Sequence, residues 1–132
     1  MILNRKIFIV LIILFYSCFF IKKKPDYTVI KGSYEIINTY DSNSKNISKI
    51  EGYVYDKVTN KKLSYGFIYC KGDSTSFTRI DSNAHFELNL IPKSYDFIIK
   101  MVGNTDLELV NISLDSGKII EIKILLGTIY IN

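Results

Sequence analysis

Short segments in which apolar and polar residues alternate constrain the fold of this chain most. In residues 86–90, for example, Phe86, Leu88 and Leu90 fall on one side of an extended strand and polar residues fall on the other. A period of two is that of a β-strand with one buried face. After residue 24 no apolar pattern keeps a helical period for three turns. The chain is therefore expected to be all-β.

Seven such segments follow one another, with turn residues between them. They lie at residues 47–55, 63–70, 74–80, 86–90, 95–101, 107–112 and 118–126. Short strands at regular spacing favour a seven-stranded β-sandwich, which buries one face of each strand. Val54, Ile68, Phe86 and Phe97 should then converge from separate strands in one core. The sandwich domain is expected to span residues 47–132.

The N-terminal residues indicate where the chain works. Arg5 and Lys6 precede an uncharged apolar run over residues 7–21, and three lysines at positions 22–24 follow it. The fifteen residues of this run would span roughly 22 Å as a helix, against a bilayer core about 30 Å thick. A cleaved signal peptide over residues 1–17 therefore fits better than a transmembrane helix. A short uncleaved N-terminal anchor is the alternative.

The last residues of this predicted signal contain a recognisable pattern. Residues 14–18 read Leu-Phe-Tyr-Ser-Cys and resemble a lipobox, the site at which bacterial lipoproteins are cleaved and lipid-modified. The resemblance implies lipidation of Cys18 and a lipoprotein anchored in the bacterial cell envelope, at the outer membrane. Residues 18–46 would then form a lipid-anchored tether and an extended segment.

The positive charge of the chain is concentrated near the N-terminus. The formal charge is +4, but five of the 17 basic residues precede Pro25, which leaves twelve basic and thirteen acidic side chains beyond it. A near-neutral domain has no basic stripe to bind phosphates, so nucleic acid is not an expected partner. The N-terminal lysines suit export and lipid headgroups instead.

Several segments of the chain resemble the carboxypeptidase regulatory-like domain. The residues that carry the resemblance are Ile50-Glu51-Gly52-Tyr53-Val54-Tyr55-Asp56, residues 63–70, Ile80-Asp81-Ser82-Asn83-Ala84-His85-Phe86 and Tyr95. They are similar to an Ile-x-Gly-x-Val-x-Asp strand, a Leu-x-x-Ala-x-Val strand, an Asp-x-x-Gly-x-Phe turn and a Gly-x-Tyr strand entry. The resemblance implies a transthyretin-like sandwich of the kind found in cell-surface lipoproteins, and it reports fold more than function.

No combination of residues indicates an enzyme or a cofactor. The chain has one histidine, His85, so a zinc carboxypeptidase pattern, which needs a second histidine, is absent. Cys70 lies in an apolar strand pattern and is interpreted as a small buried residue rather than a catalytic thiol. His85 and Glu87 share a strand face, but nothing places a third metal ligand beside them. The three aspartates Asp56, Asp73 and Asp81 are interpreted as turn residues rather than calcium ligands.

The most prominent candidate surface is aromatic. If Val54 and Ile68 face the core, their aromatic neighbours on the same two strands face outward. These four residues are Tyr53, Tyr55, Phe67 and Tyr69. Outward aromatic rings can contact a protein or a glycan. The alternative, which we favour, is that residues 27–37 cover these rings as an additional strand.

These observations predict a non-enzymatic, membrane-anchored lipoprotein. Its sandwich would act as a structural or protein-interaction module in the cell envelope, with a protein partner there. The alternative is a carbohydrate-binding module that uses the four outward aromatic side chains to stack against a glycan.

Overall fold

The computed structural model describes residues 23–132 of the chain, and the predicted signal peptide and Cys18 lie outside this range. The described residues contain ten strands and no helix. The strands are β1 (Tyr27–Ile30), β2 (Ser33–Asp41), β3 (Ser48–Asp56), β4 (Phe67–Cys70), β5 (Asp73–Arg79), β6 (His85–Leu90), β7 (Lys93–Lys100), β8 (Leu107–Leu114), β9 (Lys118–Leu126) and β10 (Thr128–Ile131). The all-β expectation is therefore confirmed.

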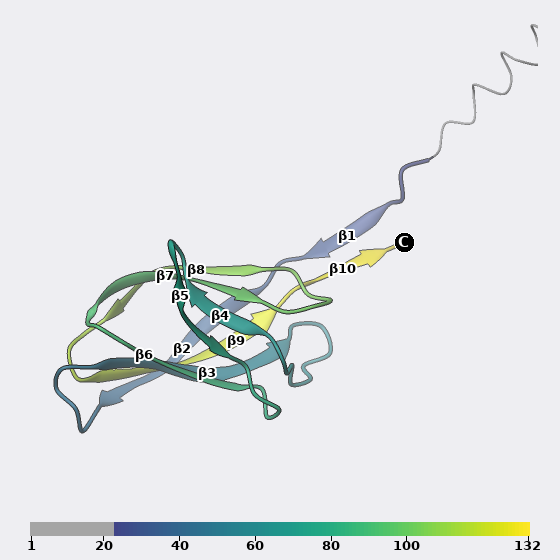
Figure 1. Ribbon diagram of the computed structural model, residues 1–132. Coiled ribbons are helices and arrows are strands. Elements are labelled where there is room, and N and C mark those ends of the chain that lie inside the picture. Colours follow the sequence, from purple (N-terminus) through teal and green to yellow (C-terminus); the bar gives the residue numbers. More distant parts are fainter. Residues whose placement is uncertain (1–22) are drawn as a thin grey trace, which may run out of the picture.

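Eight of these strands form two sheets that pack face to face (Figure 1). One sheet has the order β2-β9-β3-β6 and the other the order β5-β4-β7-β8. Neighbouring strands are antiparallel, apart from β3 and β9, which run parallel. The remaining strands, β1 and β10, pair with each other as a two-stranded ribbon that projects from one end of the sandwich (Figure 1).

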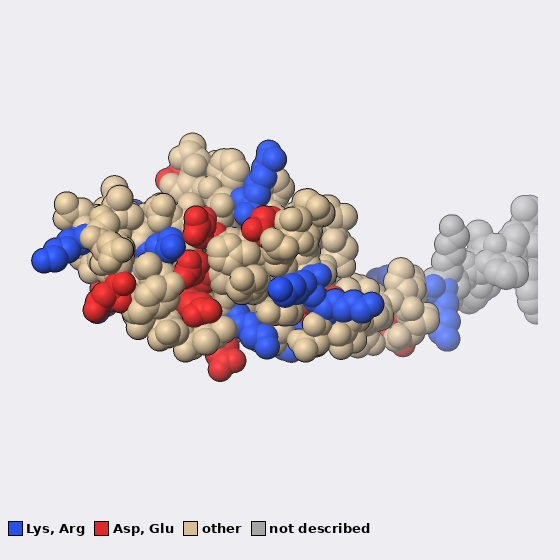
Figure 2. Space-filling view, turned by 90° about the horizontal axis from the view of Figure 1, so that it is seen from below, with Lys and Arg blue, Asp and Glu red and all other residues tan. Residues whose placement is uncertain are grey.

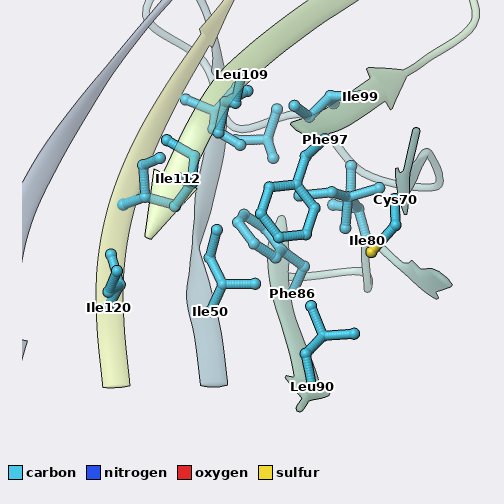
Figure 3. Close-up of a cluster of buried hydrophobic side chains, with 14 of the residues drawn as sticks. Ile50, Cys70, Ile80, Phe86, Leu90, Phe97, Ile99, Leu109, Ile112 and Ile120 are labelled. Atoms are coloured by element: carbon cyan, nitrogen blue, oxygen red, sulfur yellow. The ribbon is translucent and has the colours of Figure 1, made fainter. Parts of the chain in front are cut away.

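The core lies between the two sheets, as the alternation predicted. Val54, Ile68 and Phe97 are fully buried and Phe86 is 1% exposed, so all four expected residues converge in one interior. Figure 3 shows Phe86 and Phe97 close together within this cluster, with aliphatic side chains from several strands around them. Each fully buried aromatic or branched side chain contributes about 1.5–3 kcal/mol to stability, so this cluster is what holds the two sheets together.

The number of strands differs from the seven that the sequence predicts. Three strands were not counted, namely β1, β2 and β10. The first two lie within residues 18–46, the stretch interpreted as tether and extended segment. Every residue of β2 after Ser33 is exposed despite its pairing with β9. A strand without a buried face leaves no strong alternation in the sequence, which explains why these strands were not counted among the strands of the sandwich.

The ribbon continues directly from the first sheet. One residue, Gly127, separates β9 from β10, and two residues, Lys31 and Gly32, separate β1 from β2. The backbones approach so closely here that a Cβ atom on Gly127 would stand 1.7 Å from the carbonyl oxygen of Ile30. The bend from sheet to ribbon therefore depends on the absence of a side chain at position 127.

Candidate functional site

The four predicted contact residues lie on two opposite faces of the molecule. Tyr53 and Tyr55 are on the outer face of β3, and Phe67 and Tyr69 are on the outer face of β4. Because β3 and β4 belong to different sheets, these outer faces point away from each other. The structure thus keeps each pair together and separates the two pairs.

Residues 27–37 do not cover these rings, so that interpretation is wrong. β2 pairs with β9, which lies between β2 and β3, and so extends the sheet sideways. A strand added at the edge of a sheet cannot form a layer over its outer face. Tyr53 accordingly keeps 38% of its surface exposed and Phe67 keeps 42%.

The two tyrosines on β3 already have partners in their own sheet. The Tyr53 ring lies 5.0 Å from the ring of His85, centroid to centroid, and the Lys62 ammonium group is 4.9 Å from the Tyr53 ring. Tyr55 has the Lys123 ammonium group 5.2 Å from its ring. These cation–π and ring contacts use the same faces that a ligand would need.

A charged network occupies the same outer face next to Tyr53. Lys49 Nζ lies 3.1 Å from Glu51 and 3.5 Å from Glu87, and the Tyr40 hydroxyl donates a hydrogen bond to Glu51. Partial burial alone would raise the pKa of Glu51, but the hydrogen bonds from Tyr40 and Lys49 outweigh it and lower the pKa. Figure 2, which views the molecule from below Figure 1, shows lysine and acidic side chains interspersed.

The outer face of β4 and β5 also has a cation–π contact, from Arg79 to the Phe67 ring at 5.8 Å, but aromatic rings there line a recess of about 280 Å³. Phe67, Tyr69 and Phe77 form its walls, together with Ser74 and Lys100. The Phe67 and Phe77 ring centroids are 6.3 Å apart and the ring planes are tilted by 57°, a separation within the range at which aromatic pairs attract each other. Phe77 is 49% exposed, so the pair presents apolar surface to solvent.

A second recess of about 260 Å³ adjoins the first and shares Phe67 and Lys100 with it. Tyr65 and Val102 line it on the exposed side, and Asp106 pairs with Lys100 at 3.4 Å. We refer to the exposed rings on this face as the aromatic surface, which comprises Tyr65, Phe67, Tyr69 and Phe77. It is the candidate site.

Tyr65 is a member of this surface that sequence reasoning missed. It is 78% exposed and has a φ of 67°, in the left-handed region. A bulky residue is rarely found there, since its Cβ crowds the backbone. Strain of this kind is concentrated at functional sites in proteins. The sequence contained no signal for it, because a Ser-Tyr-Gly turn is compatible with several backbone conformations.

The three aspartates that were weighed as calcium ligands each stabilise their own turn. Asp56 accepts hydrogen bonds from the backbone N–H groups of Thr59 and Val58 at 2.8 and 2.9 Å. Asp73 accepts from the backbone and hydroxyl of Thr75, and Asp81 from the N–H groups of residues 83 and 85. The turn interpretation is therefore supported over the calcium one.

The remaining candidates are Cys70, the possible metal ligands among residues 23–132, and Cys18. Cys70 is 3% exposed, and burial raises the pKa of its thiol. Over residues 23–132 no three side chains among His, Cys, Asp and Glu gather as metal ligands would. In the same range the structure has no helix with the length and apolar character needed to span a bilayer. Cys18, the predicted lipidation site, lies outside the described residues.

Comparison with known proteins adds no family to this description. The chain matches no protein-family model and no curated protein. The geometry of the aromatic surface is therefore the main evidence on function.

Proposed function

We propose that this chain is a non-enzymatic lipoprotein of the bacterial cell envelope, anchored in the outer membrane through Cys18, whose sandwich acts as a protein-interaction module. The anchor is supported by the lipobox-like residues 14–18 and by an apolar run that is short for a transmembrane helix. The finer fold that we propose is the transthyretin-like sandwich of carboxypeptidase regulatory-like domains. It is supported by the motif residues around Gly52 and Phe86, which lie in β3 and β6.

The aromatic surface is the observation that carries the interaction function. Exposed rings are enriched at protein interfaces because they bury a large area at a small cost in side-chain entropy. Phe67 and Phe77 expose 42% and 49% of their surface next to Lys100, so an apolar contact area stands beside a cation. Because Lys100 already pairs with Asp106 at 3.4 Å, a partner with apolar side chains would complement the exposed rings.

Site-specific photocrosslinking in native envelopes tests this proposal. A photoreactive phenylalanine analogue at position 77 should give a discrete crosslinked species. The matched control is position 53, because Tyr53 has comparable exposure but lies on the opposite face. Equal crosslinking at both positions, or none at position 77, would contradict an interface at the aromatic surface.

The anchor is tested separately by metabolic labelling with palmitate. Labelling of the intact chain and its loss in a Cys18→Ala variant are expected. Persistent label in the variant would show that lipid is attached elsewhere, and an unlabelled intact chain would favour the short uncleaved anchor.

A second candidate function is glycan binding by the same surface. Sugar rings stack on exposed aromatic faces, and Ser74 and Lys100 supply hydrogen-bond donors beside Phe67 and Phe77. A glycan array with the intact protein, repeated with Phe77→Ala, tests it. Binding that is lost in the variant supports this function, and an array without signal removes it.

A further inference from the structure

The β1–β10 ribbon has one face that is entirely apolar. Cross-strand partners in an antiparallel pair point to the same side, and the pairs here are Tyr27 with Ile131 and Val29 with Ile129. We refer to these four side chains as the ribbon face. Their exposed fractions are 62%, 79%, 45% and 56% in that order, so the face is open to solvent over its full length.

The opposite side of the ribbon is mixed in character. It presents the pairs Thr28 with Tyr130 and Ile30 with Thr128. The Thr28 hydroxyl accepts a hydrogen bond from the side-chain amide of Asn132 at 3.2 Å. The ribbon therefore has one apolar side and one mixed side, and an isolated two-stranded ribbon of this size is marginally stable in water. An apolar surface that packs against the ribbon face would stabilise it.

The position of the ribbon in the chain identifies the surface within its reach. Tyr27 lies nine residues after Cys18, the proposed site of lipid attachment. Nine extended residues reach at most roughly 30 Å. The two most exposed members of the ribbon face, Tyr27 and Ile131, pair at the end of the ribbon that leads along the chain to Cys18.

The charges near the ribbon fit a lipid surface. Lys23 and Lys24 are exposed and precede the ribbon, separated from it by Pro25 and Asp26, and Lys31 follows β1 at the end of the ribbon next to the sandwich. Lysines attract anionic headgroups, and tyrosines are enriched where lipid headgroups meet the acyl chains. An apolar face flanked by lysines is typical of segments that lie in the membrane interface.

We propose that the ribbon face lies against the lipid surface to which the chain is anchored, and so fixes the orientation of the sandwich on the membrane. The inference rests on the membrane anchoring proposed above. The ribbon contacts the interface and does not cross the bilayer, because the outer backbone edges of two strands would remain without hydrogen-bond partners in hydrocarbon. The apolar side chains enter the boundary between headgroups and acyl chains.

Tryptophan fluorescence tests this contact in the full chain, which contains no tryptophan of its own. The protein is reconstituted into phosphatidylethanolamine–phosphatidylglycerol vesicles whose acyl chains are brominated near the headgroup. The reporter variant is Ile131→Trp, and Ile91→Trp is the control. These isoleucines are 79% and 76% exposed. Ile91 follows Leu90, which pairs with the first residue of β3, and the ribbon leaves the sheet near the last residue of β3. The control position and the ribbon therefore lie at opposite ends of this sheet.

We expect the tryptophan of the Ile131→Trp variant to show a blue-shifted emission maximum in vesicles. Its fluorescence intensity should be mostly quenched when the acyl chains are brominated, while the intensity of the Ile91→Trp variant should not change. Ile129→Trp should behave as Ile131→Trp does, and Tyr130→Trp on the opposite side should be quenched less. Flotation of each variant with the vesicles reports the anchoring independently.

Three other results would overturn the inference, and they differ in what they imply. Flotation with equal emission from Ile131→Trp and Ile91→Trp removes the ribbon contact and leaves the anchoring intact. Failure of the protein to float removes the anchoring as well. A blue shift in detergent without vesicles that grows with protein concentration assigns the ribbon face to a second copy of the chain.

Discussion

Tyr65 combines a left-handed backbone with a side chain that contributes nothing to the core. Its φ is 67° and its exposed fraction 78%. For a residue with a Cβ this conformation costs about 1–2 kcal/mol. An exposed ring makes few contacts within the monomer that could offset this cost. In the function proposed above, the ring would serve contact with a partner rather than folding.

Replacement of Tyr65 should separate stability from binding. Tyr65→Gly removes the Cβ crowding and should raise the free energy of unfolding by about 0.5–1 kcal/mol, because the relief exceeds the added entropy of the unfolded chain. Tyr65→Ala removes the ring but keeps the crowding. Denaturant unfolding should thus distinguish the two variants, while crosslinking from position 77 weakens in both. A Tyr65→Gly variant that is less stable than Tyr65→Ala would show that the backbone is not strained.

Asp56 predicts how stability responds to acid. The N–H of Thr59 is the largest cause that lowers its pKa, with further hydrogen bonds from Val58 and from the Asn104 side chain, and burial offsets part of this. Because the folded-state pKa is depressed, the stabilisation is complete above the unfolded value of about 3.9 and is lost as pH falls through the folded value.

The test is denaturant unfolding of the full chain in detergent between pH 2 and 7. Asp56→Asn keeps an oxygen that accepts the same backbone hydrogen bonds but cannot titrate, so its stability should fall less steeply below about pH 4. If the free energy of unfolding of Asp56→Asn falls with decreasing pH as steeply as that of the parent chain, other carboxylates control the acid response.

At the scale of the elements, Gly127 decides whether the ribbon can leave the sheet. Its backbone is not left-handed, so the requirement is one of space, with Ile30 O at 1.7 Å and Gly32 N at 2.8 Å from a Cβ on residue 127. Gly127→Ala should therefore separate β1 from β10 and leave the sandwich folded. Hydrogen exchange should accelerate in residues 27–30 and 128–131 by tenfold or more, for a loss of over about 1.4 kcal/mol.

Ile131→Ala is the control for this change, because it alters the same ribbon without touching the bend. It should leave amide exchange in β9 and β3 unchanged and affect the ribbon mildly. Loss of protection throughout the sandwich in Gly127→Ala would show that the ribbon and the sheets unfold as one unit.

The elements differ in how far the sequence could predict them. Strands with one buried face, such as β6 around Phe86 and β7 around Phe97, produce the strict alternation that identifies a strand. The edge strand β2 is exposed on both sides, so the order of its apolar and polar residues does not indicate a buried face. The ribbon depends on close backbone approaches at Gly127 and Gly32, and a glycine in a sequence does not reveal which backbone will pass beside it.

At the scale of the whole molecule, the pairing of strands between sheets decides the candidate site. Alternation predicts that Tyr53 and Phe67 both face outward, but it does not tell which sheet each strand joins. Long-range pairing places β3 beside β9 and β4 between β5 and β7. Phe77 comes next to Phe67 through the hairpin of β4 and β5, and Tyr65 lies two residues before Phe67 in the chain, whereas the separation of these rings from Tyr53 follows from the pairing of strands within the two sheets.

Phe97 and Phe77 provide the last prediction, because they are the same residue type in the same sheet on opposite faces. Phe97 is fully buried between the sheets, whereas Phe77 is 49% exposed on the aromatic surface. Phe97→Ala removes a core ring and should lower the free energy of unfolding by about 3–5 kcal/mol, a large part of the total for a domain of this size. Phe77→Ala should cost less than about 1 kcal/mol.

Binding should respond in the opposite order at temperatures where both variants remain folded. Crosslinking from a photoreactive analogue at position 67 should be lost in Phe77→Ala and retained in Phe97→Ala, since the outer face needs the ring at position 77 and the core ring acts through folding. Denaturant unfolding and crosslinking on the same samples measure both quantities. If Phe77→Ala instead destabilises the chain as strongly as Phe97→Ala, the exposed rings are needed for stability, and the proposal that the aromatic surface is an interface is wrong.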